Sequence, residues 1–163
     1  MIFICVGSRD YQFDRLIKKV DELVDIKEVE DEIFAQIGQS SYIPKNFKYK
    51  RFMSVDEFKE CQMNADLIIS HGGTGALIGA LKLHKQVIAV PRLAKFGEHT
   101  DDHQTQVAGV LAKEGYLKMV LDMDKIAEEI IDIKKNPITK KYNRPSNVFE
   151  IICNFIEENS HTR

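Results

Sequence analysis

The sequence predicts an α/β fold, with a single Rossmann-like, doubly wound parallel sheet that carries helices on both faces. Two observations support this prediction. The apolar runs at residues 67–69 and 87–90 show no polar alternation, as expected for parallel strands that are covered on both faces. Segments with apolar residues at helical spacing separate such runs, so strands and helices alternate along the chain. The 163 residues have room for one domain with its own core, and we expect residues 1–163 to form it.

Five strands are expected, each a short run rich in apolar or β-branched residues. The first is entirely apolar and ends at a glycine turn, whereas the third is short and mixed. The expected strands are residues 2–6, 33–37, 48–53, 67–69 and 87–90.

Helices are expected between these strands, and several have recognisable ends. Apolar residues recur at helical spacing from Phe13 to Val24. Ser54 and Glu57 fit a capping box that opens a helix through about Met63. The remaining expected helices are residues 75–83, 100–113, 124–135 and 145–158, with residues 136–144 as a linker. In the helix at 100–113, Asp101 and Asp102 are expected in the first turn and Gly115 at the C-terminal cap.

The composition restricts the class of protein. A formal net charge of −2 argues against a broad nucleic-acid surface, so we expect no nucleic-acid partner. No apolar run approaches the roughly 18–20 residues that cross a bilayer, and the first residues do not resemble a signal peptide. Cys5, Cys61 and Cys153 are far apart and form no Cys-x-x-Cys pair, which favours free thiols in a reducing cytoplasm.

A glycine-rich loop follows the strand at 67–69. It comprises His71, Gly72, Gly73, Thr74 and Gly75. In open parallel sheets, such a turn lets backbone N–H groups approach a phosphate, and the next helix presents its positive N-terminus to the same anion. The loop has no third glycine at Ile78 and no Walker lysine, so it matches neither common nucleotide fingerprint. The alternative is a tight turn in which His71 is only structural.

Two further loops end strands of the same predicted sheet. Gly7, Ser8 and Arg9 form a turn after the first strand, and this turn faces the crevice of the glycine-rich loop if the two strands are neighbours. Arg92 and Lys95 follow the strand at 87–90. These cations either neutralise a diphosphate or are solvated surface residues.

Residues 98–104 concentrate polar side chains. They include Glu98, His99, Asp102, His103 and Gln104. Such a set can hydrogen-bond the hydroxyls of a sugar, and Glu98 or a histidine could accept a proton. The spacing of His99 and His103 also suits a metal on one helix face, but no third ligand is evident and we expect no metal. The alternative is a helix cap with surface charges.

These motifs resemble the donor-binding half of nucleotide-sugar glycosyltransferases with the two-domain GT-B fold. The resemblance is strongest to the PssE-like subunits of bacterial exopolysaccharide synthesis. More distantly, the chain is similar to the C-terminal domain of MurG-type GlcNAc transferases and to the small subunit of the dolichol-linked GlcNAc transferase. The resemblance rests on residues 65–75, 90–93, 97–99 and 101–104, with residues 6–8 and 13–16.

The resemblance implies a UDP-sugar-binding glycosyltransferase domain. The loop at 71–75 would hold the diphosphate, the backbone near Met53 the uracil, and residues 102–104 the sugar. One departure concerns the MurG-like pattern, which has a ribose-binding glutamate where this chain has Gly79. The ribose contact would then come from elsewhere, for example Glu98.

The resemblance also implies partners and location. A membrane-anchored, acceptor-binding subunit would complete the GT-B fold and present a lipid-diphosphate-linked sugar in exopolysaccharide or capsule synthesis. The chain would be cytoplasmic and recruited to the inner face of the membrane, and it would need no cofactor besides its UDP-sugar substrate. Two other readings stay open: a non-catalytic nucleotide-sugar-binding module that activates a partner transferase, and a small stand-alone enzyme acting on a free nucleotide.

Overall fold

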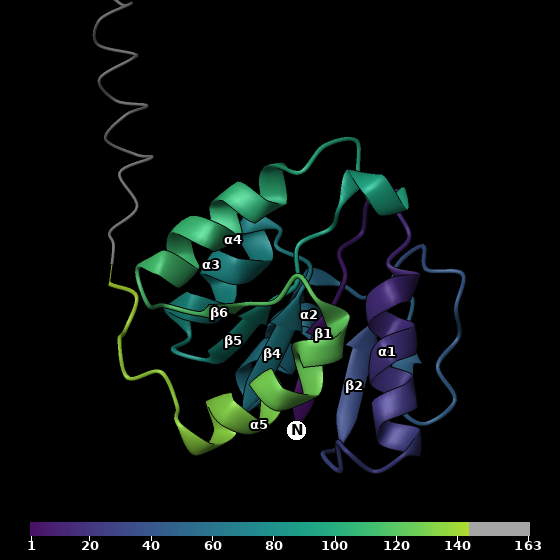
Figure 1. The fold of residues 1–163 in the computed structure, drawn as a ribbon, viewed down its shortest axis with the longest axis horizontal. Coiled ribbons are helices and arrows are strands. Elements are labelled where there is room, and N and C mark those ends of the chain that lie inside the picture. The colour runs from purple at the N-terminus through teal and green to yellow at the C-terminus, as the bar shows by residue number, and fades with distance from the viewer. Residues whose placement is uncertain (144–163) are drawn as a thin grey trace, which may run out of the picture.

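The computed structural model describes residues 1–143, and its centre is a parallel sheet of six strands (Figure 1). The strand order is β3-β2-β1-β4-β5-β6, and every neighbouring pair is parallel. The strands are β1 (Ile2–Cys5), β2 (Ile33–Gln36), β3 (Lys48–Lys50), β4 (Leu67–Ser70), β5 (Gln86–Ala89) and β6 (Lys118–Met119). This order defines a doubly wound sheet and confirms the predicted fold class.

Helices cover both faces of the sheet, because alternate side chains of each buried strand point to opposite sides. On one face, α1 and α5 pack over side chains such as Ile4 and Ile69. On the other face, α2, α3 and α4 pack over side chains such as Phe3 and Ile68. The helices are α1 (Asp14–Asp25), α2 (Val55–Asn64), α3 (Thr74–Lys82), α4 (His103–Lys113) and α5 (Ile126–Lys135), with 3₁₀ turns η1 (Ala94–Phe96) and η2 (Met123–Lys125).

The predicted elements lie close to the observed ones, except for a missed sixth strand and a later start of the helix expected from residue 100. The capping box of α2 forms as predicted: Ser54 Oγ accepts a hydrogen bond from the backbone N–H of Glu57, whose side chain accepts one from Ser54 N–H. The sixth strand, β6, was not predicted because two residues are too few to show a pattern. The expected helix at 145–158 and Cys153 lie outside the described residues.

The helix expected from residue 100 begins only at His103, so the placement of Asp101 and Asp102 in its first turn is wrong. Both carboxylates accept hydrogen bonds ahead of the helix instead. Asp102 Oδ1 accepts from the N–H of Ala94, 2.8 Å away, and Asp101 Oδ1 from the N–H of His103, 3.0 Å away. These bonds hold residues 94–102 in a turn and loop.

The strand order brings three site-bearing loops together. Because β1 lies between β2 and β4, and β4 between β1 and β5, the loops after β1, β4 and β5 meet at one edge of the sheet. The chain also reverses its winding direction between β1 and β4, which is where open α/β sheets bind ligands. Among residues 1–143, none of the helices has the length and apolar character needed to traverse a bilayer.

Candidate functional site

A cavity of about 500 Å³ opens at this edge of the sheet, between the loops that follow β1, β4 and β5. Its lining contains two arginines but no carboxylate, which suits an anionic ligand. The lining residues are Gly7, Ser8, Arg9, His71, Gly73, Thr74, Gly75, Ala76, Arg92, His99, His103 and Gln104.

The N-terminus of α3 forms one wall of the cavity. Gly73 is the N-cap residue, and no side chain caps the helix. The first N–H groups of a helix have no partner within the helix, and they carry the positive end of its dipole. Because Thr74, Gly75 and Ala76 line the cavity, this wall can bind a phosphate with backbone donors.

His71 lies between the loops that follow β1 and β4, and it is neutral. Its Nδ1 is 3.1 Å from the carbonyl oxygen of Cys5. Since a carbonyl only accepts hydrogen bonds, Nδ1 carries the proton and Nε2 does not. Burial, reinforced by the positive charge of Arg92, lowers the pKa of His71 to about 4. His71 therefore contributes shape, not charge, to the anion site.

The ring of His71 requires glycine on both sides. A Cβ atom at Gly7 would lie 2.7 Å from His71 Nε2, and one at Gly73 would lie 2.4 Å from the same atom. Gly7 also has a φ of +85°, which favours glycine. The two glycines thus serve the packing of the histidine as well as the approach of a ligand.

We expect Gly73→Ala to lower the free energy of unfolding by about 1–3 kcal/mol, because the new methyl group overlaps the His71 ring. In a His71→Ala background the same substitution should cost little, since the ring is gone. Gly75→Ala is the matched control, because a Cβ there meets no heavy atom within 4 Å. Urea unfolding of the four-variant cycle measures the coupling, and additive losses would contradict the contact.

The buried, neutral state of His71 also predicts a pH dependence of stability. Its pKa is lower in the folded chain, at about 4, than the value near 6.5 of an unfolded chain. The unfolded chain therefore binds more protons between these values, and the stabilisation present above pH 6.5 is lost as the pH falls towards 4. The free energy of unfolding of the wild type minus that of His71→Gln should therefore decrease by about 1–3 kcal/mol as the pH falls from 6.5 to 4. Urea unfolding at a series of pH values measures it, and a constant difference would contradict the assignment.

Arg92 is a buried cation at the cavity, with its side chain only 1% exposed. Its Nη2 donates to the carbonyl oxygens of Val6 at 2.5 Å and Tyr11 at 3.1 Å, and the rings of Tyr11 and Phe13 flank the guanidinium. Its Nε is buried and donates to no atom of the described residues. Burial lowers the pKa of Arg92 to about 10, so the group remains charged at neutral pH. A fixed, charged guanidinium beside the cavity favours an anionic ligand there.

Two buried glutamines hold the loops in place. Gln36, at the end of β2, accepts from Gly7 N–H at 3.0 Å and donates to the carbonyl oxygens of Gly7 and Arg51. Gln104 accepts from the N–H of Arg92 at 3.1 Å. The sequence analysis did not identify Gln36, although a polar residue at the end of an apolar strand was a usable signal.

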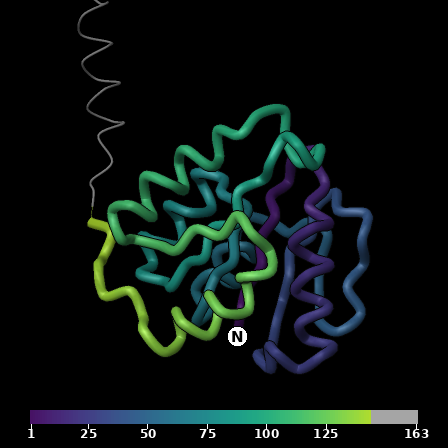
Figure 2. Tube along the Cα trace, viewed as in Figure 1, coloured from purple at the N-terminus to yellow at the C-terminus, as the bar shows by residue number. Residues whose placement is uncertain are grey.

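Glu98 does not face the cavity, which corrects its expected role as proton acceptor and ribose or donor contact. It is fully buried, and Arg15 binds both carboxylate oxygens, with Nε 2.8 Å from Oε1 and Nη2 3.0 Å from Oε2. The N–H of Leu93 also donates to Oε2 at 2.9 Å. The segment between β5 and α4 runs over the start of α1 (Figure 2), and the ion pair between Arg15 and Glu98 fastens the segment to this helix.

His99, Asp101 and His103 form a cluster at the rim of the cavity. Their potential ligand atoms lie within 4.8 Å of one another, so Asp101 is a third candidate ligand that was not evident in the sequence. Within this cluster, the Nδ1 of His103 hydrogen-bonds Asp101 Oδ1. His99 packs on Tyr11 with ring centroids 4.8 Å apart, and burial lowers the pKa of His99.

A second, apolar cavity of about 260 Å³ adjoins the first and shares Gly7, Ser8, His71 and Ala76 with it. Phe52, Met53 and Phe58 belong to its lining. Gly79 lies in neither cavity. A Cβ there would be 3.3 Å from Gln62 Oε1, so this position of α3 faces α2.

The structure thus gathers most of the predicted site residues and leaves four outside the main cavity. Met53 lines the apolar cavity, and Gly72 is buried behind the loop with a φ of +83°. Glu98 and Asp102 hold the loop at 93–102. Arg9 and Ala76 line the main cavity although they were not among the predicted site residues.

Together, the strand order and the cavity at the reversal of winding define a Rossmann-like domain with a crevice whose lining suits an anionic ligand. The sequence profile of the glycosyltransferase family 28 C-terminal domain matches residues 1–156, so the chain belongs to this family. It is also 32% identical over 124 residues to the mouse (Mus musculus) UDP-N-acetylglucosamine transferase subunit ALG13, and 30% identical over 125 residues to the human (Homo sapiens) protein of the same name. These matches cover 71% of this chain but only 10% of each relative.

Solved structures agree on the fold. MurG from Acinetobacter baumannii superimposes with a TM-score of 0.65 at 18% identity, covering 95% of this chain and 49% of that one. A solution structure of ALG13 gives a TM-score of 0.57 at 18% identity, with 93% of this chain and 94% of that chain covered. The fold is therefore that of the C-terminal half of GT-B glycosyltransferases.

Proposed function

We propose that this chain is the donor-binding, catalytic subunit of a two-component glycosyltransferase of the PssE-like type. It would move a hexosyl group, with inversion, from a UDP-sugar to a lipid-linked acceptor in exopolysaccharide or capsule synthesis. Membership of glycosyltransferase family 28 supports glycosyl transfer, and the names of the curated relatives describe a UDP-N-acetylglucosamine transferase subunit.

The observation that carries the proposal is the pair of adjoining cavities at the reversal of winding. The polar cavity offers the N-terminus of α3 and the Arg92 guanidinium to a diphosphate, and these positive groups offset the charge that the leaving diphosphate gains. The apolar cavity beside Met53 suits the uracil ring. The transferred sugar would then lie towards His99, His103 and Gln104.

A partner subunit would supply the acceptor site. Phe52 and Val55, at the apolar cavity, are 46% and 83% exposed, and such apolar side chains suit a surface that another protein covers. We propose a membrane-anchored partner that presents a lipid-diphosphate-linked sugar and recruits this chain to the cytoplasmic face of the membrane.

Calorimetric titration of the purified chain with UDP, UDP-glucose, UDP-galactose and UDP-glucuronate tests donor binding, with the corresponding ADP and GDP compounds as controls. We expect micromolar to millimolar binding of the uridine compounds and at least about tenfold weaker binding of the others, a difference of about 1.4 kcal/mol. No binding of any uridine diphosphate compound would overturn the proposal.

A second candidate is a non-catalytic nucleotide-sugar-binding module that activates a partner transferase. Two observations favour it: the carboxylate of Glu98 is occupied by Arg15, and Gly79 stands where the MurG-like pattern has a glutamate. Membranes from a strain that lacks this chain distinguish the two candidates. If these membranes release UDP from a UDP-sugar without added chain, the result supports the non-catalytic module.

A further inference from the structure

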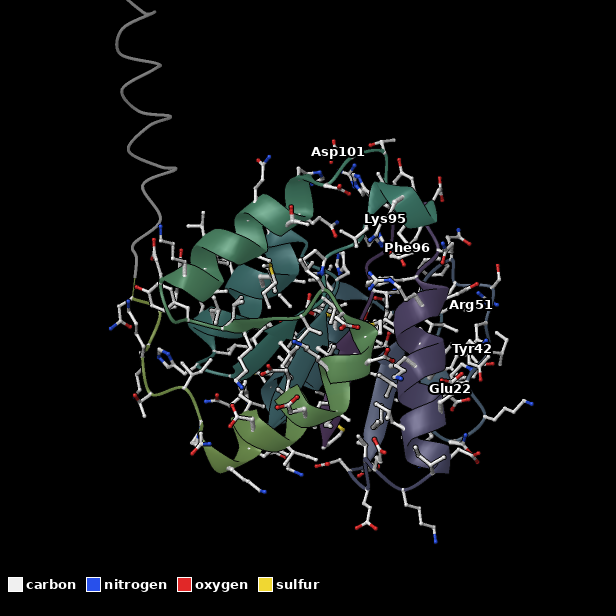
Figure 3. All side chains as sticks on the ribbon, in the orientation of Figure 1. Glu22, Tyr42, Arg51, Lys95, Phe96 and Asp101 are labelled. Carbon is white, nitrogen blue, oxygen red and sulfur yellow. The ribbon has the colours of Figure 1, made fainter. Side chains whose placement is uncertain are left out.

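We infer that His103, oriented by Asp101, is the general base that deprotonates the acceptor hydroxyl; this inference rests on the proposed function. The notable geometry is a hydrogen-bonded carboxylate–imidazole pair at the rim of the donor cavity. His103 begins α4, Asp101 lies in the preceding loop, and both belong to the end of the molecule where Figure 3 labels Asp101.

The other titratable side chains at the cavity are unsuited to this task. His71 is neutral, and its Nε2 packs between Gly7 and Gly73. His99 has a side chain only 8% exposed and packed against Tyr11, and its Nδ1 accepts from the N–H of Asp101 at 3.4 Å. Arg9 and Arg92 are cations and cannot accept a proton.

Glu98 is excluded as well, because Arg15 and the N–H of Leu93 occupy its buried carboxylate. His103 differs from all of these residues. Its side chain is 52% exposed, so an incoming acceptor can reach it, and it still lines the cavity.

The hydrogen bond between His103 Nδ1 and Asp101 Oδ1 sets the tautomer. A carboxylate only accepts, so Nδ1 carries the proton and the lone pair of Nε2 is available. Asp101 also accepts from the His103 N–H at 3.0 Å, and these bonds lower the pKa of Asp101, which keeps its carboxylate charged. Asp101 is thus a positioning residue.

In the proposed step, the proton and the glycosyl group are transferred together. Nε2 of His103 takes the proton of the acceptor hydroxyl while the acceptor oxygen bonds to the anomeric carbon of the sugar. The bond from that carbon to the β-phosphate oxygen breaks, and its electron pair leaves with UDP. The imidazolium then releases its proton to solvent, to which His103 is half exposed.

Long-range ¹⁵N–¹H spectra of the purified chain test the tautomer without any partner. We expect His103 to be protonated at Nδ1 in the wild type and at Nε2 to a large extent in Asp101→Asn. An Nε2-protonated His103 in the wild type would overturn the inference.

Transfer is measured with membranes from a strain that lacks this chain, which supply the acceptor and any partner. We expect His103→Gln to reduce kcat by about 10²–10⁴-fold, as for loss of a general base, while UDP binding by the purified variant changes less than threefold. Asp101→Asn should also lower kcat, by a smaller factor, because the ring of His103 is then no longer held with its proton on Nδ1. His84→Asn, outside the donor cavity, is the histidine control and should behave as the wild type.

Three other outcomes would overturn the inference or the proposed function. Full turnover by His103→Gln, or full turnover by Asp101→Asn, would overturn the inference while UDP binding upholds the proposed function. Turnover that EDTA abolishes and Zn²⁺ restores would instead make His99, Asp101 and His103 metal ligands and would also overturn it. Failure of the wild type to bind any UDP-sugar would overturn the proposed function and this inference with it.

Discussion

Glu98→Leu is expected to lower the free energy of unfolding by about 3–5 kcal/mol, because it leaves the Arg15 guanidinium without its counter-ion in a largely buried site. The Arg15 side chain is 17% exposed, and Glu98 is 0% exposed. The substitution also removes the acceptor of the Leu93 N–H. Urea unfolding followed by circular dichroism measures the loss.

The double variant Arg15→Met with Glu98→Leu should be more stable than Glu98→Leu alone, because replacing both charges by apolar groups avoids the unpaired charge. Asp124→Leu is the matched control: it breaks the pair with Lys19, but Asp124 is 86% exposed, so the effect should be small. A Glu98→Leu chain of unchanged stability that has lost transfer activity would restore Glu98 as a catalytic residue and contradict our assignment.

Arg92→Met is expected to weaken UDP binding about 10–100-fold, the equivalent of one or two charge-assisted hydrogen bonds. The guanidinium lines the polar cavity, and its Nε has no partner among the described residues. The UDP affinity of Arg92→Lys should lie between those of the wild type and Arg92→Met, because an ammonium group keeps the charge but not the planar geometry of the guanidinium. Calorimetric titration with UDP measures the affinities, at a temperature where circular dichroism shows each variant folded.

Arg51→Met is the matched control for this experiment. Its Nη1 also donates to two backbone carbonyls, those of Gly38 and Ser40, but the side chain lies outside the polar cavity. UDP affinity should be unchanged in this variant. An affinity of Arg92→Met within twofold of the wild type would show that Arg92 is a structural cation and that the diphosphate lies elsewhere.

The main features of the fold could be predicted from the sequence because they depend on local patterns. The apolar runs at β4 and β5, the helical spacing in α1 and the capping box of α2 are each set by neighbouring residues. The short strand β6 was missed because its pairing with β5 is a long-range contact that two residues do not signal.

The candidate site was only partly predictable. Glycine-rich and polar loops identified the edge of the sheet, because the loops that follow parallel strands meet at the same edge. The roles within that edge were not predictable. Glu98, adjacent to His99 in the sequence, was grouped with the polar cluster, yet its partner Arg15 lies 83 residues away. Nothing local distinguishes a carboxylate that faces a ligand from one that faces a distant arginine.

By itself, then, the sequence determined the alternation of strands and helices and the three loops from which a site could be built, since periodicity and backbone conformation are local properties. Only the tertiary structure decided which groups face the cavity. The strand order places β1, β4 and β5 side by side, and Arg92, His71 and Glu98 acquire their hydrogen-bond partners from residues far along the chain. Burial and hydrogen bonding are properties of the assembled loops, and they separate a buried ion pair from a reactive side chain.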